Sequence, residues 1–424
     1  MNIPNNERLE SVYGESTKSA ERFRALADNF KKIYGHNEAA FFTSPGRTEI
    51  IGNHTDHNGG RVIAGSIDLD TIGAAAKNDS SVIHITSEGY AQEIVVDITK
   101  LDSVSKVVST QSLVAGMMEA AKKFGFETGG FDAYVSTNVI AAAGVSSSAS
   151  FEMLVCTIIN HLFNDGKMSV SDYARIGQYS ENVFWNKASG MMDQMACAVG
   201  GPVLFSFANG SEPQYEPLDF SFQSKGYRLV IVNTGKGHAD LSDEYSGIPN
   251  EMKAAAKVIG VERLCETNLG ALLANVDKIP NDRAVLRAIH FFEEDRRVGE
   301  MADAIAKDDT AKILRLIQES GTSSWELLQN CYSLQDCKEQ KITLTLALTQ
   351  LFLNKIGDGV CRVHGGGFAG VIACLVPIAE TDNYVNYIAA YVGKDNVYPM
   401  NIRSVGAARI YTTQENDENL TPGG

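Results

Sequence analysis

The segment at residues 46–60, GRTEIIGNHTDHNGG, places several hydrogen-bonding side chains close together, with glycines on both sides. Arg47, Asn53, His54, Asp56 and His57 all fall within eleven positions. A polyhydroxylated ligand requires such a density of donors and acceptors, because each hydroxyl group needs a partner. A metal site is a rival interpretation, but the histidine and aspartate spacing matches no common zinc pattern and no cysteine lies nearby. The segment therefore predicts a site for a ligand rich in hydroxyl groups, with a solvated loop as the remaining alternative.

A second segment, GVSSSA at residues 144–149, joins a strand pattern to a helical pattern. Small side chains let the backbone approach an anion, and the first N–H groups of a helix have no partners within it. Serine hydroxyls add hydrogen bonds and can supply an oxygen ligand to Mg²⁺. The segment lacks the GxxxxGK[ST] pattern of a Walker A loop. It predicts a phosphate-binding turn, and a serine-rich N-cap on a core helix is the alternative.

A third segment, RVHGGGFAG at residues 362–370, precedes an apolar strand pattern at 371–376. Three consecutive glycines before a buried strand are unfavourable in chain entropy. They indicate either a tight turn or backbone that approaches a ligand.

These three segments, in this order, resemble the motifs of the GHMP sugar and metabolite kinases, and the 46–60 segment resembles the signature of the galactokinases among them. The resemblance covers nearly the whole chain. It implies transfer of the ATP γ-phosphoryl group to the anomeric hydroxyl of galactose, with Mg²⁺ as cofactor. It also implies an α+β protein with two domains: residues 1–212 resembling the second domain of ribosomal protein S5, and residues 213–424 forming a ferredoxin-like domain with inserted helices.

The resemblance also assigns roles to individual residues. Within GMMDQ at 190–194, Asp193 matches the catalytic aspartate, and Arg47 matches the arginine beside the reacting hydroxyl. A position early in a short helical run, 191–198, favours an ionised Asp193 carboxylate, as does a nearby arginine. Whether Asp193 removes the proton fully or assists electrostatically stays open, and a helix charge partner is the structural alternative for this residue.

The remaining site residues form three groups. The sugar-binding positions are Arg47, Asn53, His54, Asp56, Gly190, Asp193 and Tyr245, the last located through NTGKGHADLSDEY at 233–245. The nucleotide-binding positions are Gly144, Ser146, Ser147, Ser148 and Ala149. The Mg²⁺ ligands are Ser148 and Glu181.

Asn53 departs from the family pattern, because galactokinases normally have a glutamate there, facing the C6 hydroxyl of the sugar. Asparagine removes a negative charge but still donates and accepts hydrogen bonds. A sugar with an anionic C6 would be repelled less, so a galacturonokinase, or a kinase for another C6-variant sugar, is the alternative function.

Four smaller departures concern the second and third motifs. Ile140 and Ala142 replace the usual proline and glycine, while Ala369 and Val371 replace the usual glycine and cysteine. None removes a catalytic group. A catalytically silent sugar sensor on the same fold is the remaining alternative, and the retained serine loop, Glu181 and Asp193 favour the enzyme.

The composition restricts the partners and the compartment. The 424 residues include 37 basic and 52 acidic side chains, a net charge of −15 that disfavours nucleic acid as a partner. No apolar run approaches the ~20 residues of a membrane helix, and residues 1–13 lack the apolar core of a signal peptide. We therefore expect a cytoplasmic protein, a monomer that binds a small sugar and ATP and neither nucleic acid nor membrane.

Apolar periodicity predicts the elements that position these segments. Helices are expected over 23–33, 111–123 and much of 250–353, and strands over 39–75, 82–98, 131–139, 227–233, 362–377 and 406–412.

Overall fold

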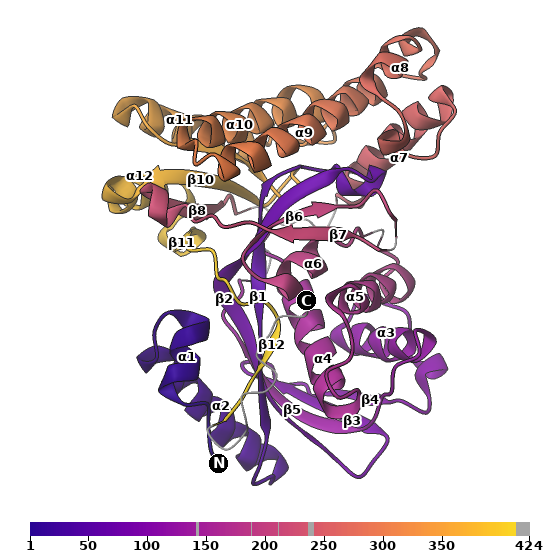
Figure 1. The fold of residues 1–424 in the computed structure, drawn as a ribbon, viewed down its shortest axis with the longest axis vertical. Helices are drawn as coiled ribbons and strands as arrows, with labels where there is room; N and C mark the ends of the chain where they lie inside the picture. Colours follow the sequence, from indigo (N-terminus) through magenta and orange to yellow (C-terminus); the bar gives the residue numbers. More distant parts are fainter. Residues whose placement is uncertain (141–143, 188, 211, 236–240, 413–424) are drawn as a thin grey trace.

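The computed structural model describes residues 1–140, 144–187, 189–210, 212–235 and 241–412. Within these ranges the strands form an eight-stranded sheet and a four-stranded sheet (Figure 1). Helices cover both sheets, and the long helices α9 and α10 lie over the second one (Figure 1). The arrangement is the α+β architecture that the family resemblance implies.

Two long antiparallel strands, β1 (Ala40–Ile51) and β2 (Arg61–Lys77), form the centre of the first sheet. The strand order is β12-β1-β2-β5-β3-β4, and β6 and β7 extend the sheet from the other end of β2. The other strands are β3 (Val82–Ser87), β4 (Ile94–Asp97), β5 (Phe131–Thr137), β6 (Pro202–Ser206), β7 (Gln214–Pro217) and β12 (Ala408–Ile410). The register of β1 against β2 shifts between Pro45 and Arg47, and a bulge of this kind re-aims a side chain.

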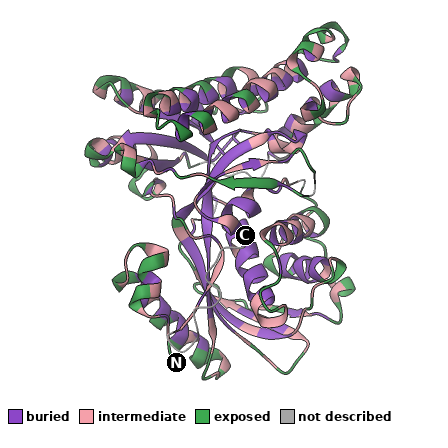
Figure 2. Cartoon of the chain, viewed as in Figure 1, coloured by how far each residue is buried: buried purple, intermediate pink, exposed green. Residues whose placement is uncertain are grey.

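Neighbouring residues of β1 point to opposite faces of this sheet and pack against different helices. Phe41 packs with α2, while Phe42 packs with α4. The first face carries α1 (Asn6–Tyr13) and α2 (Thr17–Tyr34). The second face carries α3 (Thr110–Lys123), α4 (Ser147–Phe163), α5 (Val170–Phe184) and α6 (Met192–Val199). Figure 2 shows the resulting buried interior along β1, β2 and α4.

The second sheet has the order β11-β8-β10-β9, and all of its neighbouring strands are antiparallel. Its strands are β8 (Tyr227–Asn233), β9 (Val360–His364), β10 (Val371–Pro377) and β11 (Val397–Met400). Val230 and Val232 belong to the core beneath α11 and α12, whereas Leu229 and Ile231 belong to the core beneath α9 and α10. This alternation gives a sheet covered on both faces.

The helices of this part are α7 (Ser242–Ile259), α8 (Leu269–Leu273), α9 (Asp282–Ala306), α10 (Thr310–Ser323), α11 (Lys341–Ile356) and α12 (Thr381–Val392). Short helical turns are η1 (Asp56–Asn58), η2 (Leu101–Ser103), η3 (Gln223–Lys225), η4 (Leu264–Glu266), η5 (Val276–Lys278), η6 (Ser324–Leu328), η7 (Ile378–Glu380) and η8 (Lys394–Asn396).

Most predicted elements agree with the structure, and two details differ from the expected pattern. Ile33, at the end of the helix predicted over 23–33, is 46% exposed, whereas the next residue, Tyr34, packs against the core beneath α2. The strand after the predicted domain boundary at residue 212, β7, still pairs with β6 in the first sheet. The chain passes from the first sheet to the second between Pro217 and Tyr227, and β12 returns to the first sheet, while the division into domains at residue 212 stays a prediction. Among the described residues, no helix is both long and apolar enough to cross a bilayer.

A buried carboxylate on β2 bonds to side chains from α1, from α2 and from the segment before β12. Asp70, which is fully buried, accepts hydrogen bonds from Tyr13 at 2.8 Å and Thr43 at 2.6 Å. It also forms ion pairs with Arg22 at 2.8 Å and Arg403 at 3.0 Å. Burial raises the pKa of Asp70, but the two guanidinium groups outweigh it, so the net shift is downward. The ionised form is therefore stabilised by folding.

Replacing this carboxylate should destabilise the protein strongly. Because one buried arginine would lose its partner, we expect Asp70→Asn to lower the free energy of unfolding by about 3–5 kcal/mol at pH 7 in urea titrations. The pKa is depressed in the folded state, so the difference from wild type should shrink as the pH falls below about 4. Asp68→Asn, at an exposed position of the same strand, is the matched control. Equal effects of the two substitutions would contradict this account.

Candidate active site

Arg47, Asp193 and Ser146 come from three separate elements and meet at one point. Arg47 follows the bulge in β1, Asp193 lies in the first turn of α6, and Ser146 is the N-cap of α4. The Arg47 Nε donates to Asp193 Oδ1 at 2.8 Å, and the Ser146 hydroxyl donates to Asp193 Oδ2 at 2.6 Å. Arg47 also donates to the carbonyl of Gly144. The predicted guanidinium and carboxylate are thus adjacent to each other and to the serine-lined turn.

The electrostatics of this cluster keep the carboxylate ionised. Burial alone would raise the pKa of Asp193, but the charge and hydrogen bond of Arg47, together with the Ser146 hydroxyl, lower it to about 2. The side chain of Arg47 is only 6% exposed, whereas that of Asp193 is 35% exposed. An ionised carboxylate that is partly open, with a buried guanidinium behind it, can accept a hydrogen bond from a hydroxyl group of a ligand.

The turn before α4 has a tightly constrained backbone. Gly144 and Ser146 both have positive φ angles, +63° and +58°. A Cβ atom on Gly144 would lie 2.4 Å from Val371 Cγ2, so the glycine allows the turn to rest directly on β10. Ser147 and Ser148 are partly exposed in the first turn of α4, while Ala149 is buried. Of the residues noted as departures, Val371 forms this contact and Ala142 lies outside the described residues.

Ser148 and Glu181 lie side by side, as expected for ligands of one cation. The Ser148 hydroxyl is 3.4 Å from Glu181 Oε1, and Lys187 Nζ is 2.7 Å from the same oxygen. Ser189 donates to the other carboxylate oxygen, and the Glu181 side chain is only 2% exposed. Burial lowers the pKa of Lys187, but the charge of Glu181 outweighs it, so the ammonium group stays charged. The sequence reasoning missed Lys187, because nothing in its spacing distinguishes it from a surface lysine.

This pair of oxygen ligands fits Mg²⁺ better than a transition metal. Within the described ranges, no group of three or more His, Cys, Asp or Glu side chains is arranged to hold a metal ion. Mg²⁺ commonly takes one or two protein oxygens and completes its shell with phosphate oxygens and water. The Lys187 ammonium group lies 2.7 Å from Glu181 Oε1, so Lys187 and a metal ion would share this carboxylate.

His54 and Tyr245 both bind the glycine turn of the third segment. The Nε2 of His54 is 3.0 Å from the carbonyl oxygen of Gly366, and the Tyr245 hydroxyl donates to the carbonyl of Gly367 at 2.8 Å. Because a carbonyl only accepts, the proton of His54 is on Nε2 and its Nδ1 is an acceptor. Burial and the neighbouring His57 lower the pKa of His54 to about 3, so the ring is neutral near pH 7.

Asp56 and Gly190 are in close contact. A Cβ atom built on Gly190 would lie 2.1 Å from Asp56 Oδ2, so only glycine leaves room for this carboxylate. Asp56 belongs to η1, and Gly190 lies three residues before Asp193. The contact holds a second carboxylate beside the segment that leads to Asp193.

Asn53 is completely buried in a polar network. Its amide nitrogen donates to Glu49 at 3.0 Å and to the carbonyl of Gly365 at 2.8 Å, and its oxygen accepts from Asn330 at 2.9 Å. Glu49 also forms a buried ion pair with Arg362 at 2.8 Å. The amide of Asn53 therefore supports the glycine turn. Sequence reasoning missed Glu49 and Arg362 because residues 313 positions apart carry no local signal of contact.

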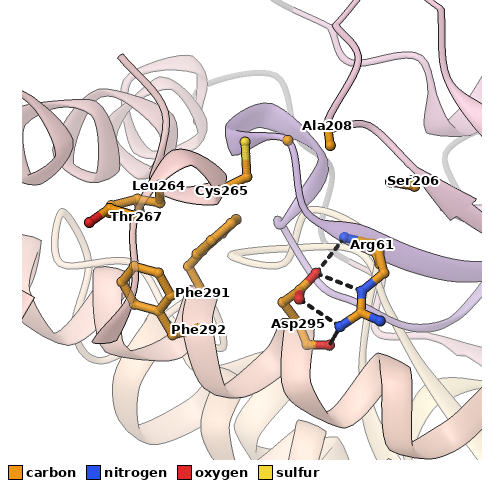
Figure 3. A pocket seen from close by; sticks show the side chains of 10 residues that line it. Arg61, Ser206, Ala208, Leu264, Cys265, Thr267, Phe291, Phe292 and Asp295 are labelled. Carbon is orange, nitrogen blue, oxygen red and sulfur yellow. Dashed lines mark hydrogen bonds and ion pairs between the residues drawn. The ribbon is translucent and has the colours of Figure 1, made fainter. Parts of the chain in front are cut away.

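A cavity of about 230 Å³ borders the far end of the 46–60 segment (Figure 3). Gly59, Cys265 and Phe291 line it, together with the ion pair of Arg61 and Asp295. In Figure 3 the Arg61 guanidinium faces Asp295, to which it donates at 2.8 and 3.2 Å. None of the predicted site residues lines this cavity, so it is separate from the cluster at Asp193.

A methyl group at Gly190 should disturb sugar binding selectively. Since Gly190→Ala would push the Asp56 carboxylate aside, we expect KM for the sugar to rise at least about tenfold in steady-state assays, with a smaller change in KM for ATP.

Gly247→Ala is the matched control, because a Cβ atom in that part of α7 meets only Arg287 Nη1, at an ordinary 3.5 Å. An unchanged sugar KM in the Gly190 variant would show that Asp56 does not line the sugar site.

Comparisons with known proteins agree with this geometry. The galactokinase galactose-binding signature matches residues 28–77, and the GHMP kinases N terminal domain matches residues 112–201. A galactokinase from Clostridium tetani is 30% identical over 364 residues, covering 84% of this chain and 89% of the relative. The chain belongs to the galactokinase family. A Ligilactobacillus salivarius galactokinase is 28% identical and covers 92% of this chain and 97% of its own length.

Solved structures extend the comparison to the fold. The structure of Lactococcus lactis galactokinase complexed with galactose matches with a TM-score of 0.78 and 25% identity, covering 91% of this chain and 99% of that one. Methanococcus jannaschii mevalonate kinase matches with a TM-score of 0.59 and 15% identity, covering 88% and 100%, which shows the shared GHMP kinase fold. The predictions of galactokinase family membership, of the fold class and of an ATP-dependent kinase are thereby confirmed. The roles of individual residues stay predictions.

Proposed function

We propose that this member of the galactokinase family transfers the γ-phosphoryl group of ATP to the C1 hydroxyl of galactose. The observation that carries the proposal is the Arg47–Asp193 ion pair beside the serine-lined turn before α4. The relative solved with galactose bound supports galactose as the sugar. Phosphoryl transfer depends mainly on positioning and charge neutralisation, and this cluster offers both.

Asp193 and Arg47 act together on the reacting hydroxyl. The carboxylate accepts a hydrogen bond from the C1 hydroxyl and receives its proton as the bond to phosphorus forms. A carboxylate with a pKa of about 2 is a weak base, so the adjacent guanidinium must stabilise the developing negative charge on the sugar oxygen. Because Arg47 both lowers the pKa of Asp193 and faces that oxygen, the two roles are inseparable.

The nucleotide side is formed by α4 and its preceding turn. Gly144, Ser146, Ser147 and Ala149 provide backbone N–H groups and hydroxyls for the phosphates at a helix N-terminus. Ser148 and Glu181 hold Mg²⁺, which when bound neutralises phosphate charge. Lys187, bonded to Glu181, adds a second positive charge at the same place.

The sugar ring lies against residues of the first and third motifs. His54 offers Nδ1 as an acceptor, and Asp56 offers a carboxylate. Tyr245 and Gly190 line the rest of this proposed sugar site. Asn53 supports the glycine turn through Gly365. It does not bind the sugar itself, because both polar atoms of its side-chain amide bond to other protein groups.

The buried charges near Asn53 favour galactose over galacturonate. A C6 carboxylate would need a cation as partner, but Arg362 is already paired with Glu49. Burying an unpaired carboxylate beside this pair is strongly unfavourable. The proposed site residues all lie in one chain, so the site as proposed does not require a second copy.

A substrate panel tests this proposal. With ATP and Mg²⁺, we expect turnover of galactose and, less efficiently, of 2-deoxygalactose. We expect kcat/KM for galacturonate or glucose to be at least about 100-fold lower. ADP release and the sugar 1-phosphate product are measured in parallel. A higher kcat/KM for galacturonate would overturn the choice of sugar, and no turnover of any hexose or uronate would overturn the kinase.

Asp193→Asn should stay folded, with lower stability because Arg47 loses its charged partner, and should lose activity. Removal of the proton acceptor is expected to lower kcat by about 10²–10⁴-fold, because an amide cannot receive the proton of the hydroxyl. Circular dichroism and thermal unfolding check that the variant is folded. A folded variant with near-normal kcat would exclude Asp193 from the proton transfer.

Glu181→Gln should raise the Mg²⁺ requirement. Loss of one anionic ligand is expected to increase the Mg²⁺ concentration for half-maximal rate by about tenfold or more. The matched control is Glu119→Gln, a carboxylate on α3 that accepts a hydrogen bond from Tyr179 and lies outside the proposed site. An unchanged Mg²⁺ dependence in the Glu181 variant would remove Glu181 from the metal site.

A further inference from the structure

Three neighbouring helices carry the groups assigned to phosphoryl transfer, and one buried side-chain pair contacts all three. α4 carries Ser148 and, one turn later, Glu152. α6 carries Asp193 and the adjacent Gln194. The amide nitrogen of Gln194 donates to Glu152 Oε2 at 3.1 Å, with the residues 1% and 0% exposed. This bond links the helix of the serine turn to the helix of the proposed base.

The third helix, α5, rests on the same pair through a glycine. Gly177 lies one turn before Glu181. A Cβ atom on Gly177 would be 2.5 Å from Glu152 Oε2 and 2.9 Å from Gln194 Cγ. The bare backbone of α5 is therefore packed against both side chains, and α4, α5 and α6 lie side by side (Figure 1).

The hydrogen bonds of the pair are incomplete if Glu152 is ionised. In the described part of the chain, Glu152 Oε1 and Gln194 Oε1 are both buried and have no hydrogen-bond partner. A carboxylate and an amide oxygen are both acceptors, so neither can satisfy the other. A proton on Glu152 Oε1 supplies the missing donor and closes a ring of two hydrogen bonds with the Gln194 amide.

The surroundings of Glu152 are consistent with a neutral acid. Burial, followed by the charge of Glu181, raises the pKa of Glu152 to about 8. The hydrogen bond of Gln194 and the charge of Lys187 act in the opposite direction, but burial and Glu181 outweigh them.

We propose that Glu152 is a positioning residue. As a neutral acid paired with Gln194, it holds α4, α5 and α6 together, so that Ser148, Glu181 and Asp193 keep their relative positions. Glu152 is completely buried, so it acts on the transfer step through the placement of Asp193. The proposal rests on the proposed function, because it deepens the account of that same site.

Two substitutions of Glu152 separate the hydrogen-bonded pair from the charge. Glu152→Gln keeps the shape and can form an amide–amide ring with Gln194, so kcat should stay within about threefold of wild type. Glu152→Leu removes the ring, and kcat should fall about 10–100-fold, the range typical of residues that orient a site. KM for ATP and galactose should change less than about threefold in both variants.

Two further variants control for folding. Gly177→Ala forces the pair apart without altering either polar group, and it should reproduce the kcat loss of Glu152→Leu. Thr157→Ala removes a buried hydroxyl of α4 that donates to the Met153 carbonyl at 2.7 Å and lies outside the proposed site. This variant should lower thermal stability and leave kcat unchanged.

Each remaining outcome contradicts the proposal. Normal kcat in folded Glu152→Leu and Gly177→Ala would show that the pair does not position the site. A kcat of Glu152→Gln as low as that of Glu152→Leu would show that a negative charge is required. If wild type itself turns over no sugar, the proposed function fails, and the pair is tested by urea unfolding instead. The free energy of unfolding of Glu152→Gln should then match or exceed that of wild type, and that of Glu152→Leu should be lower. Equal free energies of unfolding for the two variants would contradict the pair.

Discussion

The ion pair between Arg47 and Asp193 is the interaction on which the site depends. Arg47 is almost completely buried, and a buried guanidinium without a partner is strongly destabilising, so β1 and α6 must meet here. Ser146 adds a hydrogen bond from the N-cap of α4. Asp193 thereby links Arg47 of the first motif to Ser146 of the second. The bulge in β1 precedes Arg47, and Ser146 has a positive φ, so both contributing segments have special backbone conformations.

The third motif contributes through its backbone. The carbonyl groups of the 365–367 glycine turn accept hydrogen bonds from Asn53, His54 and Tyr245. Side chains would not fit at two of these glycines, since a Cβ atom would lie 2.3 Å from the Tyr245 ring at Gly366 and 2.2 Å from the Asn330 carbonyl oxygen at Gly367. The turn between β9 and β10 of the second sheet thus contacts residues of the first motif through its backbone carbonyl groups. This close backbone contact explains why the third motif is rich in glycine.

Sequence reasoning predicted the main elements and the principal cluster because their signals are local. The strand at 227–233, the helix at 111–123 and the helix after the serine turn follow from apolar periodicity, and Asp193 and Arg47 follow from motif resemblance. Non-local pairings had no such signal. Lys187 against Glu181, Arg362 against Glu49 and Gln194 against Glu152 become visible only when the helices and sheets are packed. The same limitation affected Asn53, whose burial depends on Asn330 and Gly365, and the position at which one sheet gives way to the other.

The most direct test of the central claim is a double-mutant cycle on kcat with Arg47→Ala, Asp193→Asn and the double variant. If the two residues act as one unit on the reacting hydroxyl, each single variant loses most of kcat and the double variant loses little more than the worse single variant. If the losses in the double variant multiply, Arg47 and Asp193 act independently, and the ion pair is not the centre of the reaction.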